Sequence, residues 1–228
     1  MTGLSTAVAV DVILLDFDGP TCHLFAGRSA RQIAAGLREY LAGIDVQVPA
    51  DRAGSSDPLA LYAAAVVLAP AHAAEIELWL TAAEVAASAT AEPTPGCRDV
   101  LDAARAAGQP VVVVSNNSGA AVRAYLDREH LSGQVADVVG RPYAAPDRMK
   151  PAPWPIQEAA RRQQVTPSAC VLIGDSVTDL EAADAAGARS IGYANKPGKR
   201  ERFAAATAIV DDMHQVADAI RAARTATS

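Results

Sequence analysis

Short apolar runs rich in Val and Ile alternate along most of the chain with longer Ala-rich segments in which apolar and polar residues follow a helical period. Successive Val and Ile residues are typical of strands buried on both faces, and such strands alternate with helices in parallel sheets. The pattern therefore predicts an α/β fold in which helices cover a parallel sheet. The predicted strands are 10–16, 111–115, 135–140, 170–174, 189–193 and a weaker one near Ile209.

Helical segments follow these strands, and several of them open on Ser or Pro, which are favoured at helix N-termini. The predicted helices begin near Gly96, Ser118, Pro153, Ser176, Gly198 and Met213.

The exception to the alternation is the segment 20–93, where no strand pattern is visible and Ala, Leu and Glu dominate three predicted helices. Breaks at 49–58 and at Pro70 separate these helices, and 92–96 predicts a linker back to the sheet. We therefore expect a core domain made of 1–19 and 94–228, with 20–93 inserted as a helical cap domain. Because ligands bind beside the C-terminal ends of parallel strands, this insert is placed to act as a lid.

Length and charge narrow the class of protein. A chain of 228 residues with 50% apolar residues is long enough for one large domain with an insert. Its net charge of −6 argues against nucleic acid or an anionic membrane surface as a partner. No basic leader and no apolar run of about 18 residues is present, so we expect a cytoplasmic protein. Cys22, Cys97 and Cys170 have neither disulfide nor metal-site spacing, which predicts free thiols.

Two carboxylates end the first predicted strand, at Asp16 and Asp18. Alternate residues of an extended segment point to the same side, roughly 6 to 7 Å apart, so the pair can bracket a reacting group. Asp16 could then attack this group while Asp18 handles a proton on the departing oxygen. The alternative is that an Asp pair at a strand end only forms a turn.

A second acidic pair follows the strand 170–174, at Asp175 and Asp179. Their spacing places both on one face of the following helix. The alternative here is a capping box, because Ser176 precedes Asp179 by three residues and acidic residues favour helix N-termini.

Polar residues also follow the strand 111–115. Ser115 and Asn116 stand at its end, where a hydroxyl and backbone N–H groups can bind an anion, whereas Ser118 is expected to cap the next helix. Lys150 precedes Pro151, which favours an extended backbone and holds the lysine away from the next helix. A lysine is ordinarily a solvated surface residue, but this chain has only three.

All four clusters fall at or just beyond the C-terminal ends of predicted strands, so one crevice would collect them. Like charges about 4 Å apart repel by roughly 4 kcal/mol at an effective dielectric of 20, so several carboxylates need a cation between them. Oxygen ligands without His or Cys favour Mg²⁺.

These four elements, in this order, resemble the motifs of the haloacid dehalogenase-like superfamily, in its branch with a helical cap inserted after the first motif. The first motif is 16–19, Ser115 is the second, Lys150 the third, and 174–176 with Asp179 the fourth. The resemblance implies a Rossmann-like α/β core with a cap.

The resemblance also implies residue roles. Asp16 would be the nucleophile that forms an aspartyl-phosphate, and Asp18 would protonate the leaving oxygen and then activate water. Ser115 and Lys150 would bind the phosphoryl oxygens, with Asn116 as a further substrate contact. Mg²⁺ would be held by the Asp16 carboxylate, the Asp18 backbone carbonyl and Asp175, with Asp179 supporting the site.

Details of the sequence narrow the branch of the family. Asp18 argues against dehalogenation, because a halide leaves without a proton, and the absence of lysine from 20–93 argues against cleavage of phosphonates through a Schiff base.

Two residues depart from the family pattern. Pro20 replaces the usual Thr or Ser. His23 stands where relatives often carry an acid facing the cap; it could bind an anionic substrate group, titrate, or only cover the hinge. Arg28 and Arg31 could contact substrate, although a solvated helix face is expected for them.

The sequence thus predicts a Mg²⁺-dependent phosphatase that hydrolyses a small phosphorylated metabolite, such as phosphoglycolate or a sugar phosphate. A phosphomutase shares every motif and is the first alternative; a non-catalytic module that accepts phosphate on an aspartate is the second. Whether the chain is a monomer or a homodimer stays open.

Overall fold

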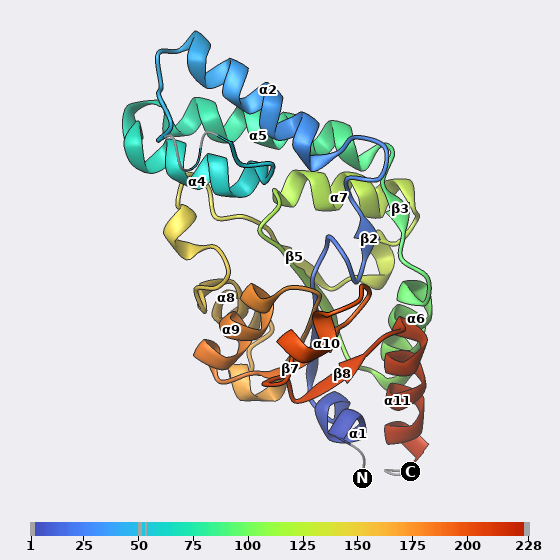
Figure 1. Ribbon diagram of the computed structural model, residues 1–228. Helices are drawn as coiled ribbons and strands as arrows, with labels where there is room; N and C mark the ends of the chain where they lie inside the picture. Colours follow the sequence, from blue (N-terminus) through green and yellow to red (C-terminus); the bar gives the residue numbers. More distant parts are fainter. Residues whose placement is uncertain (1–2, 50–51, 53, 226–228) are drawn as a thin grey trace.

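A six-stranded, wholly parallel sheet forms the centre of the computed structural model, which describes residues 3–49, 52 and 54–225 (Figure 1). Its strand order is β5-β4-β1-β6-β7-β8. The strands are β1 (Val12–Leu15), β4 (Val111–Val114), β5 (Asp137–Val139), β6 (Cys170–Gly174), β7 (Arg189–Tyr193) and β8 (Ala208–Val210). The predicted α/β fold class is confirmed. The strands β6 and β7 have the predicted bounds, whereas β1, β4 and β5 are shorter than the sequence pattern indicated.

The middle of the sheet is apolar on both faces because each face packs against its own hydrophobic cluster. Along β1, Ile13 and Leu15 belong to one cluster, whereas Val12 and Leu14 belong to the other. Side chains of a strand alternate between the two faces, so a strand covered on both sides must be apolar at every position. The uninterrupted Val and Ile runs in the sequence follow from this arrangement.

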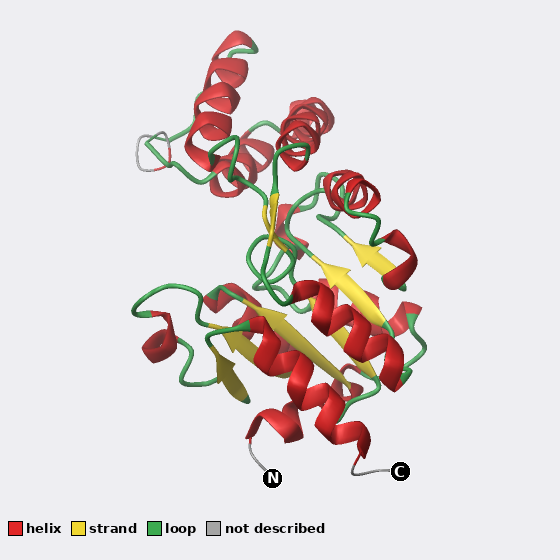
Figure 2. Cartoon of the chain, turned by 90° about the vertical axis from the view of Figure 1, so that its right-hand side faces the viewer, coloured by secondary structure: helices red, strands yellow, loops and turns green. Residues whose placement is uncertain are grey.

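Helices cover both faces of the sheet (Figure 2), and their apolar residues complete both clusters. On one face, α6 packs against α11 and α11 against α1; on the other, α8 packs against α9. The sequence analysis did not predict α1. The helices of this part are α1 (Gly3–Val8), α6 (Cys97–Ala107), α7 (Gly119–Arg128), α8 (Trp154–Arg162), α9 (Val177–Ala186), α10 (Lys199–Arg202) and α11 (Met213–Thr225), with 3₁₀ turns at η2 (Ser132–Gln134), η3 (Pro146–Arg148) and η4 (Pro167–Ala169).

Serine caps fix the start of the two helices that follow β4 and β6. The Ser118 side chain accepts a hydrogen bond from the backbone N–H of Ala121 at the start of α7. Ser176 and Asp179 form a reciprocal capping box at the start of α9. Each cap satisfies backbone N–H groups that the first helical turn leaves unpaired, and each therefore fixes where a strand-end loop becomes a helix.

Three helices of the segment 20–93 lie together beyond one end of the sheet (Figures 1 and 2). They are α2 (Ala30–Gly43), α4 (Pro58–Leu68) and α5 (Ala73–Ser88), with a 3₁₀ turn η1 (Pro70–His72) between the last two. The helices pack on one another, and the rings of Tyr40 on α2 and Trp79 on α5 stack with their centroids 5.8 Å apart. No single helix among the described residues is long and apolar enough to cross a membrane; α4 and 70–88 reach the required length and composition only together, across a bend of 116°.

The segment 20–93 contains two short strands that the sequence analysis did not predict. β2 (Cys22–His23) and β3 (Glu92–Pro93) pair antiparallel where the chain leaves the sheet and returns to it. Two-residue strands have no periodic pattern, and their partners lie about 70 positions apart, so local patterning could not reveal them. The hydroxyl of Thr94 donates to the carbonyl oxygen of Gly19 at 2.5 Å and ties this ribbon to the end of β1.

Candidate active site

One cavity of about 640 Å³ collects the sequence-predicted site residues except His23. β1 lies between β4 and β6, and all three run parallel, so the loops after them meet at one edge of the sheet. His23 is exposed on β2 and does not line the cavity. The predicted residues that do line it are Asp16, Asp18, Ser115, Asn116, Lys150, Asp175 and Asp179.

Lys150 is the buried cation of this cavity. Its Nζ lies 2.7 Å from Oδ1 of Asp16 and 2.5 Å from Oδ1 of Asp179, and it also donates to the carbonyl oxygen of Val114 at 3.1 Å. Burial alone would lower the pKa of this ammonium, but the two carboxylates outweigh burial and raise its pKa. Lys150 is therefore a fixed positive charge between the ends of β1, β4 and β6.

The carboxyl of Asp16 is buried among other acids. Burial is the largest cause that raises its pKa well above the usual value, and the negative charge of Asp179 adds to it, whereas Lys150 acts in the opposite direction. An anionic Asp16 therefore needs more positive charge than Lys150 supplies. A cation between the carboxylates would provide this charge.

Asp18 has a different environment. Its Oδ1 accepts a hydrogen bond from the backbone N–H of Leu24 at 2.9 Å. Burial raises the pKa of Asp18 to about 6, although the Leu24 hydrogen bond lowers it. A carboxyl with such a pKa can both release and accept a proton near neutral pH, which suits a group that acts as an acid in one step and a base in the next.

The carboxylates of Asp16, Asp175 and Asp179 can each offer one oxygen within 4.8 Å of the others. This all-oxygen set fits Mg²⁺ rather than a softer metal. Two glycines make room for it: a Cβ on Gly19 would lie 2.4 Å from Cγ of Asp175, and a Cβ on Gly174 would lie 2.4 Å from Cβ of Asp179. The geometry puts Asp179 itself in the cluster, whereas the sequence analysis gave it a supporting role.

The loop after β4 is held to the lysine loop by Asn116. Its side-chain Nδ2 donates to the carbonyl oxygen of Lys150 at 2.9 Å, and its Oδ1 accepts from the backbone N–H of Lys150 at 2.8 Å. The amide therefore ties this loop to the backbone of Lys150. The substrate contact expected for Asn116 stays a prediction. Ser115 is buried beside it, and its Oγ accepts the backbone N–H of Asn117 at 3.0 Å.

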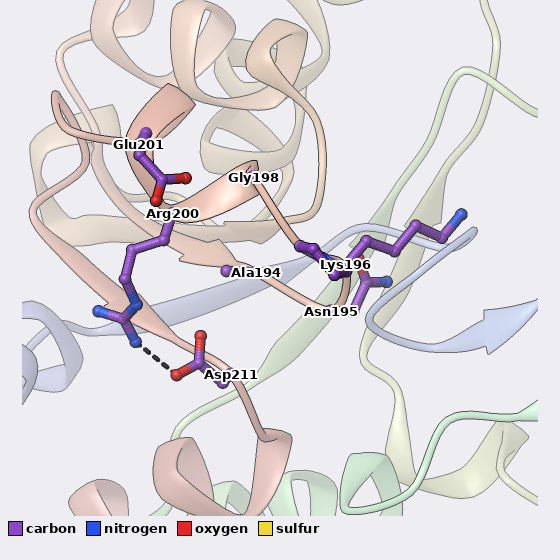
Figure 3. Close-up of a pocket in the computed structure, with 8 residues that line it drawn as sticks. Ala194, Asn195, Lys196, Gly198, Arg200, Glu201 and Asp211 are labelled. Carbon is purple, nitrogen blue, oxygen red and sulfur yellow. Dashed lines mark hydrogen bonds and ion pairs between the residues drawn. The ribbon is translucent and has the colours of Figure 1, made fainter.

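Sequence reasoning missed two residues that contact Asp175. Nζ of Lys199 lies 2.5 Å from Oδ2 of Asp175 and 2.6 Å from its carbonyl oxygen, and Nδ2 of Asn195 lies 3.3 Å from the same Oδ2. Figure 3 shows the loop that carries Asn195, which borders a second cavity of about 280 Å³. Lys196 of this loop extends away from the exposed Arg200–Asp211 ion pair. An asparagine in a loop and a lysine at the start of a four-residue helix carry no pattern that would have identified them.

The other wall of the main cavity comes from the segment 20–93. It includes Phe25, Arg52 and the N-terminal residues of α4, beginning with Asp57, which caps the N-terminus of this helix. Arg28 and Arg31 are exposed, as expected, and do not line the cavity. Only Arg31 lies on a helix, since Arg28 precedes the start of α2. Arg52 lies in the break 49–58, where no periodic pattern marked it as a site residue.

Residues 10–187 match the family model of the haloacid dehalogenase-like hydrolases. The chain belongs to this family. The family resemblance inferred from the sequence motifs is thereby confirmed.

Two curated relatives of this hydrolase are phosphoglycolate phosphatases. The protein of Xylella fastidiosa strain 9a5c is 33% identical over 108 residues, which are 47% of this chain and 46% of the relative. The protein of Escherichia coli K12 is 32% identical over 98 residues, 43% of this chain and 38% of the relative. The chain thus matches less than half the length of these relatives.

Solved structures share the fold of this hydrolase along nearly the whole chain. CbbY from Rhodobacter sphaeroides in complex with phosphate has a TM-score of 0.66 at 22% identity, covering 91% of this chain and 96% of its own. β-Phosphoglucomutase from Clostridium difficile has a TM-score of 0.66 at 15% identity, covering 96% and 98%. At these identities the likeness shows the fold.

Proposed function

We propose that this haloacid dehalogenase-like hydrolase is a Mg²⁺-dependent phosphatase that acts on a small phosphorylated metabolite through an aspartyl-phosphate. The observation that carries the proposal is the contact between Asp16 and Lys150 inside a cavity that also holds Asp18, Asp175 and Asp179. The chemistry needs a carboxylate nucleophile, a fixed cation, a proton carrier and ligands for a divalent ion, and these groups line one cavity.

In the proposed reaction, a carboxylate oxygen of Asp16 attacks phosphorus, and Asp18 gives its proton to the leaving oxygen. Asp18 then takes a proton from the water that attacks phosphorus, and this second step regenerates Asp16. Lys150 and Ser115 bind the equatorial phosphoryl oxygens and stabilise their charge. Asp16, Asp175 and Asp179 offer the carboxylates for Mg²⁺, with the carbonyl of Asp18 as a further ligand; when bound there, the ion supplies positive charge to the phosphoryl oxygens and to Asp16.

We also propose that residues 20–93 form a cap domain over a core made of 1–19 and 94–228, and that the cap limits substrate size. The cavity between the cap helices and the strand ends, about 640 Å³, suits a metabolite rather than a phosphorylated protein. The names of the curated relatives support a small substrate with a second anionic group, such as the carboxylate of phosphoglycolate.

The test is phosphate release from a panel that contains phosphoglycolate, sugar phosphates and an aryl phosphate, with Mg²⁺ and with a chelator. We expect Mg²⁺-dependent release of free phosphate, with the highest kcat/KM on a small substrate that carries a second anionic group. Asp16→Asn serves as the inactive control. Folded protein with Mg²⁺ that releases phosphate from no member of the panel would contradict the proposal, and isomerised sugar phosphate without free phosphate would assign a phosphomutase instead.

A further inference from the structure

A buried ion cluster joins helix α5 of the segment 20–93 to the loop that follows β5. The guanidinium of Arg141 donates to Oε1 of Glu77 from Nη2 at 2.7 Å and to Oε1 of Glu84 from Nη1 at 2.7 Å. The side chains of Arg141 and Glu84 are fully buried, and that of Glu77 is 5% exposed. A buried charge left without its partner is costly, so each member of this cluster needs the others.

Glu84 also reaches the loop that follows β4. Its Oε1 accepts from Nδ2 of Asn117 at 3.0 Å, and its Oε2 accepts from the backbone N–H of Ser118 at 2.9 Å. Arg141 also contacts this loop, because its backbone N–H donates to the carbonyl oxygen of Asn117 at 2.8 Å. One carboxylate of α5 is thus bonded to the segment that carries Ser115.

This contact determines how Asn117 is oriented. A carboxylate can only accept hydrogen bonds, so the NH₂ group of Asn117 must face Glu84. The carbonyl Oδ1 of Asn117 then faces the other way, where Oγ of Ser115 lies 3.3 Å from it. The backbone N–H of Asn117 donates to the same Oγ. The position of the Ser115 hydroxyl therefore depends on Glu84 through Asn117.

We propose that Glu84 is a positioning residue for the phosphoryl-binding loop, with Arg141 holding it in place. A side chain from the cap thereby sets the geometry of Ser115 in the core, and α5 and the loop 115–118 behave as one unit. This inference rests on the proposed function, since it assumes that the loop binds the transferring phosphoryl group.

Glu77 offers a matched control for a role that is only structural. It accepts from both Nε and Nη2 of Arg141, and it also accepts from the hydroxyl of Tyr62. None of its described hydrogen bonds reaches the loop 115–118. If the cluster only stabilised the fold, Glu77→Gln should therefore impair the enzyme at least as much as Glu84→Gln.

The experiment compares Glu84→Gln with Glu77→Gln in the full chain with Mg²⁺. Three properties are measured: the competitive inhibition constant of inorganic phosphate, kcat and KM on the best substrate of the panel, and the thermal midpoint.

We expect Glu84→Gln to weaken phosphate inhibition and to lower kcat by about tenfold or more, the effect of losing one charge-assisted hydrogen bond. We expect Glu77→Gln to change the phosphate inhibition constant and kcat by less than about threefold, although its thermal midpoint falls at least as far as that of Glu84→Gln. If either Gln variant fails to fold, Glu84→Asp and Glu77→Asp, which keep the charges, carry the same comparison.

Equal effects of the two substitutions on phosphate inhibition and kcat would overturn the inference and leave the proposed function standing. A wild-type protein that neither releases nor binds phosphate would overturn the proposed function, and this inference with it.

Discussion

Nζ of Lys199 lies 2.5 Å from Oδ2 of Asp175, and it also donates to the carbonyl oxygen of the same residue. A lysine is thus paired with a carboxylate that we assign to Mg²⁺. Lys199 and Mg²⁺ compete for the negative charge of Asp175. They also repel each other, since like charges about 4 Å apart repel by roughly 4 kcal/mol at an effective dielectric near 20.

We predict that Lys199→Met binds Mg²⁺ about tenfold more tightly than the wild type, as measured by titration calorimetry. The substitution also removes a partner that orients Asp175, and such a loss lowers metal affinity about tenfold to hundredfold, which is about 1.4 to 2.8 kcal/mol. The repulsion that is removed is larger than this loss, so Mg²⁺ binds more tightly. Asn195 still contacts Asp175 in the variant. Arg200→Met is the control, because it removes one positive charge from the same helix without touching Asp175. Weaker Mg²⁺ binding in Lys199→Met would show that the lysine orients Asp175 instead.

Gly19 leaves no space for a side chain beside the carboxylate of Asp175. Its φ is +125°, and a Cβ there would lie 2.4 Å from Cγ of Asp175. We predict that Gly19→Ala displaces this carboxylate and weakens Mg²⁺ binding by more than about tenfold. Gly43→Ala is the control, since nothing lies within 4 Å of its Cβ position at the end of α2. Calorimetry that finds the affinity for Mg²⁺ unchanged in Gly19→Ala would remove Asp175 from the metal site.

Asp18 is assigned as the proton carrier, so its loss should depend on the leaving group. We predict that Asp18→Asn lowers kcat/KM about a hundredfold or more on an alkyl phosphate but far less on a nitrophenyl phosphate, because an activated phenolate departs without a proton. Initial rates on the two substrates check this. Losses of equal size would mean that Asp18 does not protonate the leaving oxygen.

Glu77 gives a prediction for stability against pH. Burial raises the pKa of Glu77, but the hydrogen bonds and charge of Arg141 outweigh burial and hold its pKa below the usual value of 4.5. A lowered carboxyl pKa stabilises the fold above the ordinary pKa, and this contribution is lost as pH falls through the folded pKa. We therefore expect the free energy of unfolding of Glu77→Gln to lie about 3 kcal/mol below that of the wild type at neutral pH, with the gap narrowing below about pH 4.5. Urea denaturation of both proteins at several pH values measures the gap, and a gap that widens on acidification would show that the sign is wrong.

Much of the candidate site could be predicted from the sequence because its residues stand at strand ends. Buried strands have a strong pattern, and parallel strands bring their C-terminal ends to one edge. Asp16, Ser115 and Asp175 were therefore expected to lie together, and the structure brings them into one cavity. The family follows from the same motifs.

The rest depends on contacts between distant positions, which no local pattern records. Glu84 and Arg141 are 57 positions apart, and each has the sequence context of an ordinary surface charge. Lys199 reaches Asp175 only because β7 lies beside β6 and the following loop turns back over the strand ends. Periodicity reveals which face of an element is buried, but it does not reveal which charged side chains meet across two elements.

The central claim is that Asp16 becomes phosphorylated during turnover. The direct measurement is acid quenching of the wild-type protein during turnover of the best substrate with Mg²⁺, followed by mass spectrometry of the peptide that contains Asp16. We predict one added phosphoryl group on Asp16, no such adduct in folded Asp16→Asn, and a loss of turnover in that variant of about four orders of magnitude or more. Turnover that persists in folded Asp16→Asn, or a phosphoryl adduct on another residue of the wild type, would contradict the account.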